Sequence, residues 1–86
     1  VRFKVQIVTS SKRIPTSSPK FKGLDVEEVQ AGDLWKYSVG SEPDLDGARK
    51  VQDLCKSKGF EGSFITAWQG GKRIDLQQAV NLLRDP

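Results

Sequence analysis

The sequence predicts an α+β domain with a split β-α-β arrangement, in which a four-stranded antiparallel sheet carries helices on one face. Three observations indicate this. Residues 2–9 alternate polar and apolar side chains, as a strand with one buried face does. Residues 44–58 repeat apolar side chains at helical spacing, and strand-like segments at 34–39 and 62–68 flank them. A chain of 86 residues suits one such domain.

The connection after the first strand predicts a reduced first helix. Residues 10–23 contain two prolines and have no sustained period, so a long helix is not expected there. Ser18 precedes a proline and can start a single helical turn that ends with Phe21, before Gly23.

The middle of the chain predicts a hairpin followed by the main helix. Strands are expected at residues 24–30 and 34–39, joined by the turn "AGD". The helix over 44–58 has Ser41 or Asp44 as its candidate cap, and a glycine follows its last turn.

The last part of the chain predicts a fourth strand, "GSFITAW", the turn "QGGK" and an extra short helix capped by Asp75. Inward positions define the expected core: Phe3, Val5, Ile7, Tyr37, Val39, Ala48, Val51 and Leu54, joined by Leu76 or Val80. Trp35 is expected to pack beside Tyr37 under the helices. Cys55 lies on the apolar stripe of the main helix and is expected to be a buried thiol.

The composition favours a binding module over an enzyme. There is no histidine, which removes the commonest general base and the commonest metal ligand. Fourteen Lys and Arg oppose eleven Asp and Glu, a mild excess that fits an anionic partner without requiring one. Asp44 and Asp46 are expected to stabilise a helix start rather than to catalyse. We therefore expect no catalysis, no metal and no cofactor, and no apolar run is long enough to cross a bilayer.

Four stretches, in this order, resemble a SPOR domain, the sporulation-related repeat: "FKVQIVTSS", "WKYSVGS", "GARKVQDLCKSKGF" and "GSFITAWQGGKRI". The resemblance covers essentially the whole chain, residues 1–86. The chain most resembles the variant found as the C-terminal module of Bacteroidetes N-acetylmuramoyl-L-alanine amidases. In that variant a segment like "GKRIDLQQAVNLL" follows the last strand.

This resemblance implies an RNP/ferredoxin-like fold and non-catalytic binding of peptidoglycan, with a preference for glycan strands that lack stem peptides. It implies a monomer in the periplasm or cell envelope, without membrane insertion. The module would target a cell-wall enzyme, such as an amidase, or a division protein to the wall. Because the chain begins with Val, we expect it to be a processed product or a piece excised from such a larger envelope protein.

The resemblance assigns sugar-binding residues to the outward face of the sheet. Gln6 matches the glutamine of the first strand that lines the glycan groove. Thr9 matches the hydroxyl residue that follows, with Ser10 as its neighbour if a bulge shifts the register. Lys36 stands where the family usually has an arginine, four residues before Gly40, and it lacks the planar fork of arginine.

Further candidates share that face or lie near a strand end. Leu34 stands where an aromatic side chain of the family can stack on sugar, and Trp68 is a second stacking candidate. The full set of expected glycan-binding residues is Gln6, Thr9, Ser10, Lys36, Ser38, Leu34, Lys4 and Trp68. Lys4, Lys36 or Arg13 is expected to meet the carboxylate that muramic acid carries once its peptide is removed.

The competing function is single-stranded RNA binding, because the RRM has the same order of strands and helices. The strand "DLWKYSVG" lacks the paired aromatic residues expected of that motif, and the charge excess is slight. Nucleic acid is therefore not the expected partner.

Overall fold

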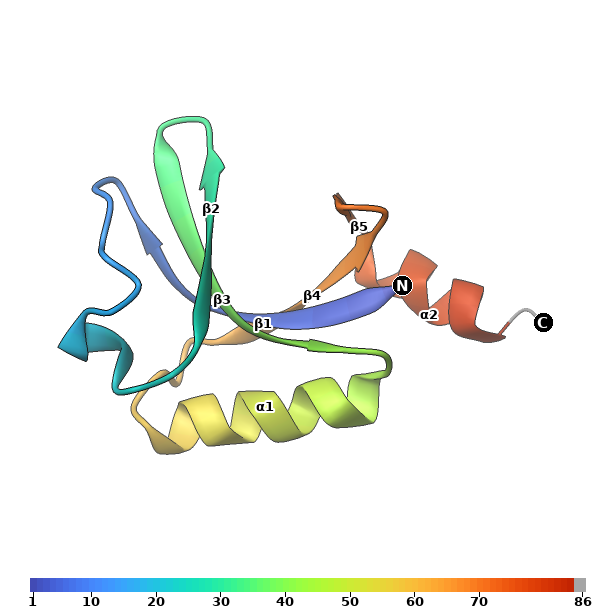
Figure 1. Cartoon of the computed structure of the whole chain (residues 1–86). Helices are drawn as coiled ribbons and strands as arrows, with labels where there is room; N and C mark the ends of the chain where they lie inside the picture. Colours follow the sequence, from blue (N-terminus) through green and yellow to red (C-terminus); the bar gives the residue numbers. More distant parts are fainter. Residues whose placement is uncertain (85–86) are drawn as a thin grey trace.

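A computed structural model describes residues 1–84 of the chain. The elements are β1 (Arg2–Ser10), the 3-10 turn η1 (Pro19–Phe21), β2 (Val26–Ala31), β3 (Leu34–Glu42), α1 (Leu45–Ser57), β4 (Phe64–Gln69), β5 (Lys72–Ile74) and α2 (Leu76–Arg84). The sheet order is β2-β3-β1-β4-β5, and each neighbouring pair is antiparallel. The chain is therefore α+β with an antiparallel sheet, as predicted (Figure 1). Within the described range, no helix has both the length and the apolar character needed to cross a membrane.

The sheet has five strands, so the prediction of four is wrong. Gly70 and Gly71 have φ angles of 58° and 81°, which suit a two-residue type I′ turn. This turn makes Gln69 and Lys72 cross-strand partners, and the segment after it pairs with β4. Ile74 packs against the core and so holds β5 in place. A strand of three residues is too short to show a period in the sequence.

The hairpin of β2 and β3 is confirmed. Ala31 and Leu34 are partners, so the loop consists of Gly32 and Asp33. Gly32 has a φ of 62°, and a glycine with positive φ at the first loop position is typical of a type II′ turn. Strand β2 begins at Val26, two residues later than predicted.

Three predicted caps are confirmed. The Asp44 carboxylate accepts a hydrogen bond from the backbone N–H of Gly47 at 2.7 Å, so it is the cap of α1. The Asp75 carboxylate accepts from the backbone N–H of Gln78 at 3.3 Å, at the start of α2. Ser18 caps the short turn η1, which takes the place of a first helix.

Strand β1 is irregular where it pairs with β3. Gln6 lies opposite Ser38, but Val8 lies opposite Tyr37, so Ile7 is an extra residue without a partner. A second shift in register lies nearer the start of the strand. Sequence periodicity places Val8 on the outward face with Gln6; this is wrong, because the bulge turns Val8 to the face of buried Tyr37.

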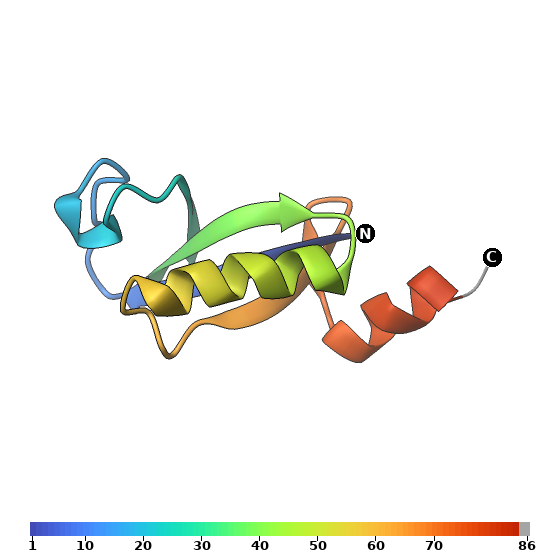
Figure 2. The same ribbon diagram turned by 90° about the horizontal axis from the view of Figure 1, so that it is seen from below.

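These bulges help to curl the sheet, because a bulge bends its strand and increases the local twist. In Figure 1 the β2–β3 hairpin and the β4–β5 hairpin both rise on the side away from α1. Figure 2, seen from below, shows α1 lying along the strands. We call the side away from α1 the concave face.

Two clusters of buried side chains lie between the sheet and the helices: Phe3, Ala48, Ala67 and Ala79 form one, and Val5, Val39 and Cys55 form the other. Because Ala48 of α1 and Ala79 of α2 share a cluster, both helices pack on the same face, as predicted. The predicted core residues Phe3, Val5, Tyr37, Val39 and Ala48 are buried, and Ile7 and Val51 pack half-buried against the second cluster. Cys55 is buried as predicted, and burial raises the pKa of its thiol.

The predicted core is wrong at Leu54, and of the two alternatives in the last helix, Leu76 or Val80, Val80 is the less exposed. Leu54 is 48% exposed and Leu76 is 39% exposed. Cys55 is the residue of the last turns of α1 that faces the sheet, and Leu54 lies about 100° away from it around the helix. In α2, Ala79 is the buried residue and Val80 is half-buried.

The end of the core near η1 is closed by the connection after β1 and not by a helix. The ring of Phe21 lies 4.9 Å from the ring of Tyr37, centroid to centroid. The Tyr37 hydroxyl accepts a hydrogen bond from the backbone N–H of Ile14 at 2.5 Å. Trp35 shares the face of Tyr37 on β3, as predicted, and is half-buried. The Arg13 guanidinium, 5.7 Å from the centroid of its ring, covers it in place of the predicted helix.

Gly40→Ala is expected to destabilise the fold by about 1–3 kcal/mol. Gly40 has a φ of 79°, and a Cβ atom added there would lie 3.3 Å from both methyl groups of Val51. Backbone strain and crowding therefore act together. The matched control is Gly62→Ala, because Gly62 lacks a positive φ and an added Cβ would meet nothing within 4 Å. Urea denaturation followed by circular dichroism measures both, and equal midpoints would contradict the expectation.

Candidate binding groove

The curl of the sheet forms a groove on the concave face. Val29 of β2 and Trp68 of β4 line the same two hollows, of about 250 Å³ and about 280 Å³. In a flat sheet these strands would lie about 14 Å apart, because two strands separate them. The first hollow is lined in addition by Ala31, Lys36, Ser38 and Arg73; the second by Arg2, Lys4, Glu27, Ser41, Gly70 and Gly71. We call the two hollows together the groove.

Two buried polar side chains mark the central strands beneath the groove. Gln6 of β1 and Ser38 of β3 are cross-strand partners, and each is 5% exposed. The row continues to Glu27 on β2 and to Phe64 on β4. The sequence predicts Gln6 and Ser38 on the outward face. The structure places them on the face opposite to the core residues Val5 and Tyr37, which precede them along β1 and β3.

The bulge brings Thr9 onto the same side as Gln6. In a regular strand, residues three apart face opposite sides. Here the Gln6 Nε2 atom donates a hydrogen bond to the Thr9 hydroxyl at 2.8 Å, and Thr9 lies opposite Lys36. Ser10 lies opposite Trp35 instead, so it does not join the others. The amide of Gln6 is therefore fixed in orientation beside Thr9, Lys36 and Ser38.

Trp68 forms part of the groove wall and is held by its neighbours. Its Nε1 atom donates to the Thr66 hydroxyl at 2.9 Å, and that hydroxyl donates to the backbone carbonyl of Lys4 at 3.2 Å. The Lys4 ammonium lies 5.1 Å from the centroid of the Trp68 ring and 2.8 Å from the Glu27 carboxylate. The indole is thus fixed in place, and the charge of Lys4 is already compensated.

The remaining predicted site residues are divided between the groove and its surroundings. Leu34 is 41% exposed beside the groove residue Ala31, at the tip of the hairpin. Arg13 was expected to meet a carboxylate of the ligand, but it bonds to the Glu28 carboxylate at 3.2 Å and lies over Trp35. Trp35 is not on the concave face, so Arg13 lies outside the groove.

The sequence prediction missed two residues near the groove. Arg73 lies on the unpredicted strand β5, opposite Trp68, and lines the smaller hollow. Phe64 is 42% exposed, with the Arg73 guanidinium 5.9 Å from its ring centroid. The signal that could have revealed Arg73 is the "GG" dipeptide, which is typical of a hairpin turn.

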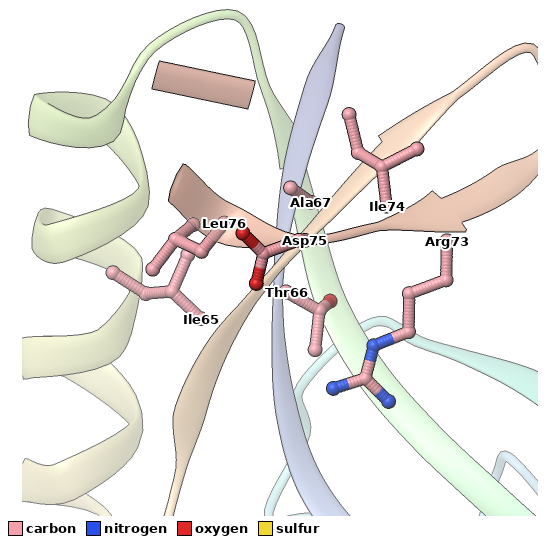
Figure 3. A pocket seen from close by; sticks show the side chains of 7 residues that line it. All are labelled: Ile65, Thr66, Ala67, Arg73, Ile74, Asp75 and Leu76. Atoms are coloured by element: carbon pink, nitrogen blue, oxygen red, sulfur yellow. The ribbon is translucent and has the colours of Figure 1, made fainter. Parts of the chain in front are cut away.

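A further hollow of about 460 Å³ lies where β5 ends beside β4 and α2 (Figure 3). Figure 3 shows Ile65 and Leu76 on one side of the β4 ribbon and Thr66 and Arg73 on the other. This hollow therefore wraps around the edge of the sheet, whereas the groove lies wholly on the concave face. Over residues 1–84, no three His, Cys, Asp or Glu side chains are grouped to hold a metal ion.

Comparisons with protein-family models, with curated proteins and with solved structures found no match for this chain. The function of the groove is therefore inferred from its side chains.

Proposed function

We propose that this chain is a non-catalytic carbohydrate-binding module. Its ligand is the glycan strand of peptidoglycan, preferably without stem peptides, so that the chain acts in the manner of a SPOR domain. The observation that carries the proposal is the fixed amide of Gln6, which is bonded to Thr9 and lies across the ladder from Ser38. Ser38 in turn lines the smaller hollow together with Lys36 and Trp68.

The chemistry of the groove suits a sugar polymer. The Gln6 amide, two hydroxyls and an ammonium offer donors and acceptors to the hydroxyl and N-acetyl groups of a glycan. A tryptophan ring can cover the apolar face of a pyranose. Ligand sites commonly combine such an apolar wall with a few placed polar groups.

The arrangement of strands supports the same proposal. We infer a split β-α-β sheet with a reduced first helix, because β1 lies between β3 and β4 while α1 connects β3 to β4. β5 and α2 then extend this unit. The module would serve at the cell envelope, where it targets a larger cell-wall enzyme, such as an N-acetylmuramoyl-L-alanine amidase, or a division protein to the wall.

Single-stranded RNA is the second candidate ligand. Phe64 and Trp68 lie on the concave face near Lys36 and Arg73, and bases stack on aromatic side chains of sheets. The net charge of +3 is low for such a partner, so the glycan is favoured.

Gln6→Met is expected to weaken binding to purified peptidoglycan sacculi by about two- to tenfold, because each lost neutral hydrogen bond costs about 0.5–1.5 kcal/mol. Methionine keeps the length of the buried side chain and removes its amide. Co-sedimentation with sacculi measures the change. Gln77→Met on the exposed surface of α2 is the matched control and should bind as the wild type does.

Two outcomes would contradict the proposal. One is a folded wild-type protein that does not sediment with sacculi. The other is binding to single-stranded RNA, lost steeply as salt is raised, in place of binding to sacculi.

A further inference from the structure

We propose that the groove recognises a carboxylate group on its sugar through Lys36 and Arg73, so that its ligand class is an anionic saccharide. This inference rests on the proposed function and specifies the chemistry of the same site. It concerns four basic residues that line the groove, two of which, Arg2 and Lys4, donate hydrogen bonds to protein groups.

Arg2 and Lys4 are occupied by neighbouring groups. The Arg2 guanidinium donates to the Ser41 backbone carbonyl at 2.7 Å and to the Ser41 hydroxyl at 3.1 Å. Lys4 donates to both oxygens of Glu27, at 2.8 Å and 3.0 Å. These contacts hold both cations against the protein and satisfy part of their bonding capacity.

Lys36 and Arg73 differ from them. Among residues 1–84, neither side chain donates a hydrogen bond to the protein or forms an ion pair, whereas Arg2 and Lys4 donate two hydrogen bonds each. Lys36 is on β3 and Arg73 is on β5, yet both line the smaller hollow of the groove. Of the described residues that line this hollow none is acidic, and Ser38 is the only other polar one. Two positive charges thus share one small hollow without a compensating charge.

An anion in this hollow would meet two cations that line it. The lining also contains the apolar side chains of Val29 and Ala31 and the ring of Trp68, and an apolar surrounding strengthens an interaction between charges. The planar guanidinium of Arg73 matches the two oxygens of a carboxylate, and the ammonium of Lys36 adds a third donor group. The shared hollow therefore fits a carboxylate better than a neutral hydroxyl.

Trp68 links this anion site to a sugar. Its ring lines the same hollow, so a pyranose that stacks on it can direct a carboxyl-bearing substituent toward Lys36 and Arg73. A peptide bond to that carboxyl group would replace the charged oxygen by a neutral amide. The preference for strands without peptides then follows from the negative charge of the free carboxylate.

The test compares one set of peptide-free glycan strands before and after conversion of their carboxylates to carboxamides. Wild-type protein is titrated with each, and the quenching of tryptophan fluorescence gives Kd. We expect amidation to weaken binding by about tenfold or more, because charge-assisted hydrogen bonds are lost. Arg73→Gln and Lys36→Gln should each weaken binding to the native strands by a larger factor than binding to the amidated strands. Lys50→Gln, on the exposed side of α1, is the control and should match the wild type.

The outcomes separate this inference from the proposed function. If the wild type binds native and amidated strands equally, the carboxylate inference is wrong while the glycan function stands. If the folded wild type binds neither, the proposed function fails, and this inference fails with it. An equal fold-loss of affinity for both kinds of strand in Arg73→Gln would also contradict recognition of the carboxylate by that residue.

Discussion

Phe3→Ala is expected to unfold a large fraction of the molecules at 25 °C. Phe3 is fully buried, and the other buried members of its cluster are three alanines, Ala48, Ala67 and Ala79. Such small side chains cannot fill the space that a phenylalanine leaves, so the loss should be about 3–5 kcal/mol. A domain of this size has a total stability near the lower end of about 5–15 kcal/mol. Urea denaturation followed by circular dichroism measures the change.

Leu54→Ala is the matched control for this experiment. Leu54 also lies on a regular element, but its side chain is 48% exposed, so the same truncation to alanine should cost less than about 1 kcal/mol. If the two variants unfold at the same urea concentration, the assignment of the core is wrong.

Trp68→Ala should reduce binding to sacculi by about thirtyfold or more, the effect of losing at least about 2 kcal/mol at a binding hot spot. The ring lines both hollows of the groove and lies against Lys4, so its removal opens one wall and takes away the surface on which a sugar would stack. Co-sedimentation over a range of sacculus concentrations measures the loss, with folding checked by circular dichroism.

The other tryptophan provides the control. Trp35 lies under Arg13, away from the groove, so Trp35→Ala should keep its affinity even if it melts earlier. Trp68→Phe should retain part of the binding, because an aromatic wall remains. Wild-type affinity in folded Trp68→Ala would show that the groove is not where sacculi bind.

The elements that could be predicted from the sequence are those that local patterns define. The alternation of β1 places Gln6 outward, and the helical period defines α1 within two residues of its ends. The bulge at Ile7 depends on the pairing of β1 with β3, which no local pattern reveals. Periodicity alone therefore gives the wrong side for Val8, and the resemblance, not the alternation, is what indicated Thr9.

The groove could be predicted only in part for a related reason. Lys36 and Ser38 follow from the alternation of β3, whereas Arg73 depends on a three-residue strand that forms through its contacts with β4. Lys4 and Glu27 are 23 positions apart in the sequence, so their ion pair could not be predicted without the arrangement of the strands. A sequence pattern identifies which side chains are charged, but not which charges are already compensated.

The way α2 is attached has a consequence for how the molecule opens. Among the α2 residues whose side chains are described, only Ala79 is buried, while Leu82 and Leu83 are 41% and 49% exposed. Figure 2 shows α2 lying to one side of the α1 layer, and no described residue of α2 lines the groove. We therefore expect α2, which is held mainly through Ala79, to be a separate unit of local unfolding. If it detaches in a brief excursion, the groove that it does not line should stay intact, so we expect ligand affinity to depend little on the order of the last helix.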